Sequence, residues 1–345
     1  GRARPPAVIA PVRVAGEEVS PGTRADLSCA VSESYTGDRL SIPVAVLHGA
    51  QTGPRMFVTA AVHGDELNGV AACRELIQRL DPQRLRGTIL VAPLVNILGV
   101  QLHSRYLPDR RDLNRAFPGS PTGSLAARIA RVVLDEIVVA SDLGVDLHTA
   151  ANRRTNVPQV RIDTADPHTL QLAEAFGAPY ILSAATRPGS LREVAADRGV
   201  PVLTFEGGEA LRFDTDAIQV AAEGILRLLH HLQMTDQAPD PPHDPPVVMY
   251  DSRWIRAERG GILDLQVGPG DQVRAGQTLW ATTDPFGRER SAVDSPDDGV
   301  VIGATTLPLV SPGDAVLHVG LIGERPPHED DPSEEEDQVE DDHPA

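Results

Sequence analysis

The sequence predicts an α/β protein with a mixed, mostly parallel sheet covered by helices on both faces, followed by a small all-β barrel or sandwich. Between residues 41 and 232, short apolar runs alternate with longer amphipathic stretches, which is the pattern of strands and covering helices. The apolar runs lack polar alternation, as expected for strands buried on both faces. Residues 247–323 contain short β-like runs separated by Pro-Gly-Asp turns, which favour a separate β-domain.

The chain of 345 residues is long enough for about two domains. We predict five segments in this order: a β-like N-terminal extension (1–40), a catalytic domain (41–235), a Pro-rich linker (236–246), a β-domain (247–323) and an acidic tail (324–345). The linker contains too many prolines to continue a helix or a strand. The tail carries high charge and almost no apolar residues, so we predict that it is disordered.

Individual elements follow from hydrophobic periodicity. The residue ranges predicted as buried strands are 56–62, 88–93, 143–147 and 200–205, and the ranges predicted as amphipathic helices are 67–80 and 214–232. Asp81-Pro82 is expected to end the first helix. Beyond the linker, the turn sequence at 267–273 is repeated at 310–316, and its proline and glycine suit the two central positions of a type II turn.

Composition excludes several classes of function. The net charge of −18 argues against nucleic acid as a partner, because binding to phosphates needs clustered cations. The sequence contains no lysine, so a Schiff-base lysine and a P-loop lysine are both excluded. Cys29 and Cys73 form no CxxC pair, and no apolar run reaches the ~18 residues of a membrane span. We therefore expect a cytoplasmic protein without a membrane partner, and the sequence is compatible with a homo-oligomer.

The first candidate site residues form an HxxE motif, His63 and Glu66, where a predicted strand gives way to a helix. In open α/β sheets, sites form at this edge. A short turn lets the imidazole and the carboxylate meet on one metal ion, and Gly64 permits the tight backbone path between them. The alternative is a helix N-terminus that carries acidic residues to complement the helix dipole.

His148 could complete the metal site. It ends another apolar strand together with Asp146, and the two-residue period places both side chains on one face. Two imidazoles and one carboxylate leave a fourth zinc position open, and zinc lowers the pKa of water from 15.7 to roughly 7. Asp146 would then accept a hydrogen bond from a ligand imidazole, although it could instead cap a turn.

Further polar residues follow other predicted strands. Asn114 and Arg115 place an amide beside a guanidinium that could grip a substrate carboxylate, although a turn residue and a surface charge would look the same. Glu206 ends the strand predicted at 200–205 and is the candidate general base. Glu209 is the competing residue, and we favour Glu206 because two glycines separate Glu209 from the strand.

Four ordered motifs, VHGDELNG, DLNRAFPG, DLHTA and TFEGG, make the sequence resemble the succinylglutamate desuccinylase/aspartoacylase family, a branch of the zinc carboxypeptidase fold. The resemblance covers residues 41–323 and implies one zinc ion per chain. Carried over position by position, it implies the following roles: zinc ligands His63, Glu66 and His148; substrate carboxylate contacts Asn114 and Arg115; general base Glu206.

The resemblance also implies an arginine that stabilises the oxyanion. Arg105 is the expected match, with Arg110 and Arg111 as rivals. Arg161, in a stretch of Arg-Thr-Asn-x-Pro-Gln-x-Arg at 154–161, and Arg192 are expected to contact the substrate. The β-domain looks like a lipoyl or biotinyl carrier barrel, but without lysine it cannot be modified.

These observations predict a zinc-dependent hydrolase, a deacylase that cleaves the amide bond of an N-acyl amino acid or of a related small carboxylate-bearing amide. One alternative is a zinc carboxypeptidase or peptide amidase that uses the same metal site. The other is a non-catalytic binding protein on the same fold.

Overall fold

The fold is built around one large mixed sheet. The structure is a computed structural model that describes residues 9–33 and 36–323, so the predicted disorder of 324–345 lies outside the described residues. Within the described residues, the large sheet has twelve strands, and two smaller sheets have two and four strands. No helix among the described residues is both long and apolar enough to cross a membrane.

The strands of the large sheet, in spatial order, are β13 (Gln272–Val273), β16 (Gly299–Thr305), β18 (Ala315–Ile322), β11 (Val247–Arg256), β9 (Tyr180–Ser183), β8 (Arg154–Ile162), β10 (Val202–Glu209), β7 (Leu143–Ala150), β5 (Gln51–Ala60), β6 (Arg86–Ala92), β4 (Arg39–His48) and β3 (Thr23–Glu33). The four central strands β10, β7, β5 and β6 run parallel to one another. β8 and β4 flank them in the antiparallel direction.

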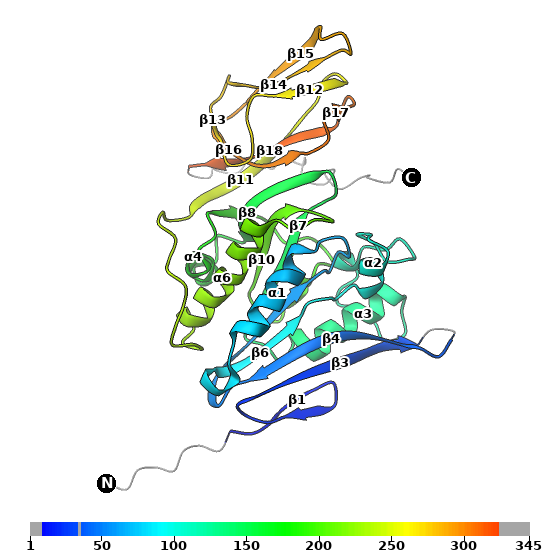
Figure 1. Cartoon of the computed structure of the whole chain (residues 1–345), viewed down its shortest axis with the longest axis vertical. Coiled ribbons are helices and arrows are strands. Elements are labelled where there is room, and N and C mark those ends of the chain that lie inside the picture. Colours follow the sequence, from blue (N-terminus) through cyan, green and yellow to red (C-terminus); the bar gives the residue numbers. More distant parts are fainter. Residues whose placement is uncertain (1–8, 34–35, 324–345) are drawn as a thin grey trace.

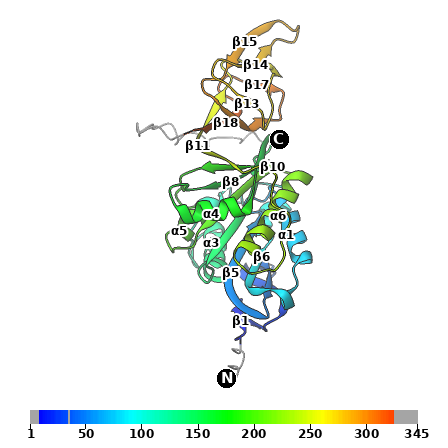
Figure 2. The same ribbon diagram turned by 90° about the vertical axis from the view of Figure 1, so that its left-hand side faces the viewer.

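Helices cover both faces of this sheet, as the amphipathic periodicity predicts. One face packs against α1 (Asn68–Arg79), α4 (Pro167–Phe176) and α6 (Thr215–His231). The other packs against α3 (Leu125–Val133), η3 (Leu134–Val138) and α5 (Leu191–Ala196). α1 and α6 lie on the opposite side of the sheet from α3 and α5 (Figure 2). The short elements η1 (Pro82–Arg84), α2 (Ile97–Gln101) and η2 (Leu113–Arg115) lie in the connections.

The predicted helices agree closely with the structure, because local signals define their ends. α1 ends at Arg79, and only its C-cap residue Leu80 separates it from the Asp81-Pro82 pair. Asp214 precedes α6, and its side chain accepts a hydrogen bond from the backbone N–H of Ala217 at 3.0 Å. This capping bond satisfies one of the free N–H groups of the first turn and fixes where the helix begins.

The C-terminal strands belong to two sheets, the end of the large sheet and a separate sheet of four strands. Together they enclose a core of their own, which contains the fully buried Trp280. The second of these sheets consists of β15 (Glu289–Asp294), β14 (Thr278–Thr283), β12 (Gly261–Leu265) and β17 (Leu309–Val310). These strands gather at one end of the molecule, while the small sheet of β1 (Val12–Val14) and β2 (Glu17–Val19) lies at the other end (Figure 1).

The large sheet continues across the predicted domain boundaries. β11 pairs with β9, β16 pairs with β8, and β3 pairs with β4, so strands from three predicted segments share one sheet. Residues 236–246 contain no helix or strand. The division of the chain into two domains at this segment stays a proposal. Because the sheet is continuous, the C-terminal strand β16 lies directly beside β8.

The two copies of the Pro-Gly-Asp turn have matching geometry. In each copy the aspartate N–H donates to the carbonyl three residues earlier, at 3.1 Å for both Asp271 and Asp314. Gly270 and Gly313 have φ of +93° and +90°, as the third position of a type II turn requires. The repeat therefore encodes two equivalent turns, as the sequence predicts.

Candidate active site

His63 and Glu66 lie in the connection between β5 and α1. The chain leaves β5 through Ala61, whose positive φ of +51° marks a sharp change of direction. Gly64 is required for a different reason from the one expected, because a Cβ there would lie 2.1 Å from the carbonyl carbon of Gly99. The glycine therefore permits two loops to approach closely, and this packing holds the segment from His63 to Glu66 in place.

The structure brings His63, Glu66 and His148 together. One potential ligand atom from each lies within 4.8 Å of the others, and all three residues are buried. The Nδ1 atoms of His63 and His148 lie 2.7 and 2.8 Å from the two carboxylate oxygens of Glu66. Residues 82 positions apart therefore meet at one edge of the parallel strands, where β5 and β7 both end.

The second nitrogen of each imidazole faces another carboxylate. Nε2 of His148 lies 2.8 Å from Asp146, which also accepts a hydrogen bond from the Thr59 hydroxyl at 2.7 Å. Nε2 of His63 lies 3.2 Å from Asp112. Asp112 has a contact that the sequence reasoning did not assign, although it begins the motif that contains Asn114. These carboxylates fix the orientation of both rings.

The electrostatics of the cluster favour a cation. Burial opposes ionisation of Glu66, but His63 and His148 outweigh it and hold the pKa of this carboxyl well below its ordinary value. Burial also opposes protonation of His148, while Asp146 and Glu66 outweigh it and raise its pKa well above the ordinary value. Two imidazoles and a carboxylate are suitable zinc ligands, so the residues present fit a bound zinc ion.

Of the three candidate arginines, Arg105 is the one that contacts the cluster. Its guanidinium lies 3.2 Å from Glu66 and 3.2 Å from Asp112. Arg111 instead pairs with Asp109 at 3.3 Å, and both Arg110 and Arg111 are exposed. Arg105 is therefore the guanidinium that a group bound at the cluster would meet.

Asn114 and Arg115 lie in η2, next to the start of α5. Asp112 precedes η2 and accepts a hydrogen bond from the Asn114 N–H at 2.8 Å. The side-chain oxygen of Asn114 accepts from the N–H of Leu191 at 2.9 Å, which leaves its Nδ2 group as a donor for a ligand. Arg115 donates to the carbonyl of Asn114 at 2.6 Å. The structure thus brings both residues beside Asp112 and the metal cluster.

Glu206 lies in a row of polar residues across three neighbouring strands. It pairs in register with His148 on β7 and with Gln159 on β8. Residues paired in this way point to the same face of a sheet. The carboxylate accepts a hydrogen bond from Asn156 at 3.2 Å and lies 3.7 Å from the guanidinium of Arg161. Glu206 therefore faces the side of the sheet on which His148 lies.

The reason given for rejecting Glu209 is wrong. Glu209 is buried and firmly held, because its carboxylate accepts from the Arg153 N–H and the Thr306 hydroxyl, both at 3.0 Å. Arg212 also pairs with it at 3.3 Å. These contacts join β10 to the loop after β16, so the carboxylate of Glu209 is occupied in holding the C-terminal strands against the catalytic part.

Arg192 lies on α5 and donates to the carbonyl of Ala184 at 3.1 Å. Burial, followed by the charges of Arg161 and Arg187, lowers the pKa of Arg192 to about 10. Arg187 is a further residue that the sequence reasoning did not single out. Nothing in its local sequence marks it, because only the fold brings its loop near Arg161 and Arg192.

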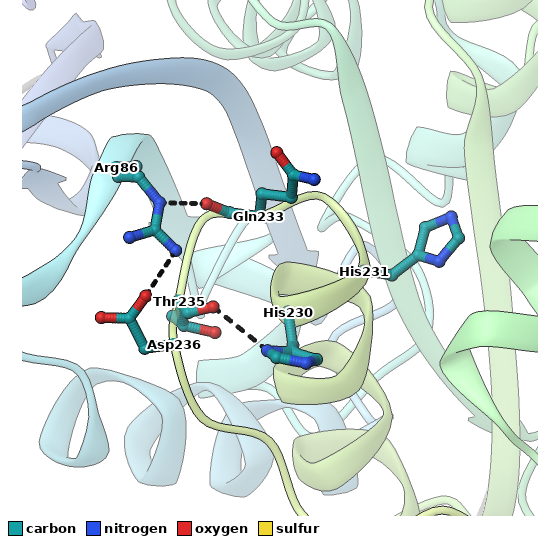
Figure 3. A pocket seen from close by; sticks show the side chains of 6 residues that line it. All are labelled: Arg86, His230, His231, Gln233, Thr235 and Asp236. Atoms are coloured by element: carbon teal, nitrogen blue, oxygen red, sulfur yellow. Dashed lines mark hydrogen bonds and ion pairs between the residues drawn. The ribbon is translucent and has the colours of Figure 1, made fainter.

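A separate surface hollow of about 520 Å³ lies at the opposite edge of the sheet, near the start of β6. Its lining residues are Arg86, His230, His231, Gln233, Thr235 and Asp236 (Figure 3). Arg86 pairs with Asp236 at 2.8 Å, and His230 contacts the carbonyl of Thr235 at 3.1 Å. These groups are paired with one another, and the ring of His231 points away from them (Figure 3).

Known proteins resemble this chain over most of its length. Residues 52–232 match the model of the succinylglutamate desuccinylase/aspartoacylase catalytic domain. The chain is 28% identical over 337 residues to the N-alpha-acetyl-L-2,4-diaminobutyric acid deacetylase of Halomonas elongata, covering 94% of this chain and 98% of that protein.

Solved structures show the same fold. A succinylglutamate desuccinylase/aspartoacylase from Rhodobacter sphaeroides matches with a TM-score of 0.77 and 27% identity, covering 87% of this chain and 96% of the other. The product-bound ectoine utilization protein EutE (DoeB) from Ruegeria pomeroyi matches with a TM-score of 0.76 and 23% identity, covering 87% and 94%. The second of these likenesses concerns the fold alone.

Proposed function

Because the chain belongs to the succinylglutamate desuccinylase/aspartoacylase family, we propose that it is a zinc-dependent deacylase that hydrolyses the amide bond of an N-acyl amino acid. The Halomonas relative is a deacetylase of an N-acetylated amino acid, which supports this substrate class. The observation that carries the proposal is the buried group of His63, Glu66 and His148, whose ligand atoms lie within 4.8 Å of one another.

The metal would be held by His63, Glu66 and His148. A zinc ion at this position supplies Lewis acidity, which polarises an amide carbonyl and eases the deprotonation of water. Asp146 and Asp112 hold the two imidazoles in the required tautomer, because each carboxylate accepts the proton of an Nε2 atom.

Glu206 is the proposed general base. It is in register with His148 and so lies on the same face of the sheet as the metal cluster, where its carboxylate can accept the proton of an attacking water. The same proton can then pass to the nitrogen of the leaving amine. The Asn156 amide and the Arg161 guanidinium contact the two carboxylate oxygens and keep the carboxylate oriented.

Arginines can bind the two negative groups of the reaction, the oxyanion and the substrate carboxylate. The Arg105 guanidinium lies beside the cluster, where it can stabilise the oxyanion that forms when water attacks the carbonyl. Asn114 and Arg115 can bind the carboxylate of the amino acid through an amide N–H and a guanidinium. The reaction then releases a carboxylic acid and a free amino acid.

The proposal is tested by metal analysis of the purified protein, followed by a hydrolysis screen of N-acetyl and N-succinyl amino acids beside short peptides. We expect about one zinc per chain, hydrolysis of N-acyl amino acids, and loss of activity with a chelator that added zinc restores. Faster turnover of the peptides would instead support a carboxypeptidase or peptide amidase. Zinc binding without hydrolysis of any of these compounds would support the alternative of a non-catalytic binding protein.

A further inference from the structure

Four arginine side chains gather in the neighbourhood of the proposed general base, Glu206. Arg154 and Arg161 belong to β8, Arg187 lies in the loop between β9 and α5, and Arg192 lies on α5. The Arg161 guanidinium is 3.7 Å from the Glu206 carboxylate. We call these four side chains the arginine rim. Because arginine keeps its charge in proteins, the fold brings four permanent positive charges together.

His318 shows how close these charges lie to one another. Burial, followed by the charges of Arg161, Arg154 and Arg187, lowers the pKa of His318 well below its ordinary value. Three guanidinium groups of the arginine rim therefore act on a single buried ring. Burial, followed by the charges of Arg161 and Arg187, also lowers the pKa of Arg192 to about 10. Positive charges in the rim thus repel one another.

The arginine rim has too few neighbouring carboxylates to neutralise it. The two carboxylates that act most strongly on Arg192 are Asp163 and Glu206, fewer than the four guanidinium groups. The rim also reaches the surface, because residues 185–188, which include Arg187, are exposed. A guanidinium binds a carboxylate through two parallel hydrogen bonds. An exposed surplus of guanidinium groups therefore favours an anionic partner.

The chain itself contains a segment of opposite charge. Residues 324–345 hold eleven carboxylates against one guanidinium, that of Arg325, which gives a net charge of −10. The carboxylates come in runs, at 329–331, 334–337 and 340–342. A run of like charges creates a stronger field than a single charge, although salt screens it beyond a Debye length of about 8 Å at physiological ionic strength. The arginine rim and this segment are therefore complementary in charge.

The acidic segment begins close to the arginine rim. Ile322, the last residue of β18, is paired with Met249 of β11. Met249 is paired with Leu182 of β9, and Leu182 is paired with Arg161 of β8. Three strand spacings of about 4.8 Å therefore separate Ile322 from Arg161, a distance of roughly 14 Å. In Figure 1, β11 lies between β18 and β8.

This distance is short compared with the length of the segment. About four to five extended residues span it, at ~3.3 Å per residue. All three acidic runs of residues 324–345 are therefore within reach of the arginine rim. A tether over such a span gives an effective concentration in the millimolar range. A contact that is weak between separate molecules is thus substantially occupied within one chain.

We propose that residues 324–345 bind the arginine rim and compete there with the anionic substrate, so that the chain carries its own inhibitor. The inference rests on the proposed deacylase function and concerns the regulation of that site. An N-acyl amino acid carries a carboxylate and binds beside the same guanidinium groups, so the segment and the substrate exclude each other. Because salt screens the attraction between the segment and the rim, the inhibition is strongest at low ionic strength.

Kinetics on two full-length, zinc-loaded proteins test the competition. One is the unaltered chain, and the other, the neutralised variant, has every Glu and Asp of residues 324–345 replaced by Gln and Asn. At low salt, KM for the best N-acyl amino acid of the hydrolysis screen should be about 3- to 10-fold higher for the unaltered chain, with equal kcat, because a millimolar effective concentration exceeds a weak dissociation constant by this factor. At about 1 M salt, where the Debye length is about 3 Å, the two KM values should coincide.

Arg187→Gln separates docking on the arginine rim from a general repulsion of anionic substrates. The quantity compared is the ratio of KM between the unaltered and the neutralised segment, measured with and without the substitution. Arg187→Gln should bring this ratio close to 1. Arg24→Gln, which removes an exposed arginine of β3 at the opposite end of the large sheet, is the matched control and should keep the ratio. A ratio that Arg187→Gln leaves unchanged would overturn the docking.

A binding measurement makes the outcome independent of turnover. A fluorescent peptide of residues 324–345 should bind the neutralised holoprotein in an anisotropy titration at low salt, and Arg187→Gln should weaken this binding several-fold whereas Arg24→Gln should not. Absence of peptide binding, or equal KM values for the two proteins at low salt, would overturn the inference. Peptide binding that depends on Arg187, in a protein that hydrolyses no N-acyl amino acid, would retain the docking and reject the deacylase.

Discussion

The metal cluster and the polar side chains of Gln159, Arg161 and His318 differ in how completely their buried polar atoms are paired. In the cluster, both nitrogens of each imidazole and both oxygens of Glu66 have partners. Among the second set, each of the three side chains has a buried atom without one. The side chains of the cluster are therefore held by the protein alone, whereas Gln159, Arg161 and His318 each keep an unused hydrogen-bonding atom.

The two regions also arise from different parts of the fold. His63 and His148 come from the carboxyl ends of parallel strands, where short connections place side chains above the sheet edge. The second set comes from β8, which runs antiparallel to β10, and from β18, which is joined to β8 through β16. The first region thus depends on the parallel strands alone, whereas the second depends on how the C-terminal strands join the sheet.

The largest effect is expected from removing a metal ligand. His63→Ala should lower zinc content to near zero and reduce kcat by about a thousandfold or more, because the metal contributes several kcal/mol to transition-state stabilisation. Zinc analysis and kinetics on the same preparation measure both. His231→Ala, in the distant surface hollow, is the control that should keep zinc and activity. Full activity in His63→Ala would remove the cluster from the mechanism.

Glu206→Gln should lower kcat by about 10²- to 10⁴-fold while zinc content stays unchanged, because general acid–base catalysis contributes that range. Glu209→Gln should mainly lower the melting temperature, since this carboxylate holds the loop that contains Thr306. If Glu209→Gln lost more activity than Glu206→Gln at equal zinc content, the two assignments would have to be exchanged.

Arg105→Ala should reduce kcat by roughly a hundredfold or more, the usual consequence of losing one oxyanion donor. Arg111→Ala is the matched control, because this guanidinium is exposed and pairs with Asp109. Steady-state kinetics on both variants measure the change in kcat. An unchanged kcat in Arg105→Ala would show that this guanidinium does not stabilise the oxyanion.

Asp146→Asn is expected to have the smallest effect, a loss of about 10- to 100-fold in metal affinity, because a partner that orients a ligand imidazole contributes this much. Competition with a zinc chelator measures the affinity. Saturating zinc should restore most of the activity in this variant. An affinity for zinc equal to that of the unaltered protein would show that the His148–Asp146 contact does not affect metal binding.

Much of the fold follows from local sequence. The uninterrupted apolar runs correctly predicted the central strands, and Asp81-Pro82 and Asp214 marked the helix ends, because capping and proline act within a few residues. The strand direction could not be predicted in the same way. β8 follows β7 after a short turn that reverses the chain, and β10 lies between them, parallel to β7, so β8 is antiparallel to β10. This pairing joins strands that are far apart in the sequence, so no local pattern predicts it.

The candidate site likewise combines residues that the local sequence predicts with contacts that depend on distant residues. Residues within named motifs, such as His63 and Glu206, could be proposed from the sequence because the residues of one motif lie within a few positions of one another. Asp112 was part of a quoted motif, but its contact with His63 depends on how the loop before η2 folds. Glu209 was misjudged because its partners include Thr306, which lies 97 residues away.

By itself the sequence determined which residue types could hold a metal, the absence of lysine chemistry, and the positions of the strands and helices, since these depend on side-chain identity and local periodicity. Only the tertiary structure decided which arginine meets the metal cluster and which C-terminal residue lies near Asn156 and Arg161. His318 lies 112 positions after Glu206 and belongs to no motif, so its place beside Gln159 and Arg161 arises only when β16 and β18 extend the sheet beyond β8.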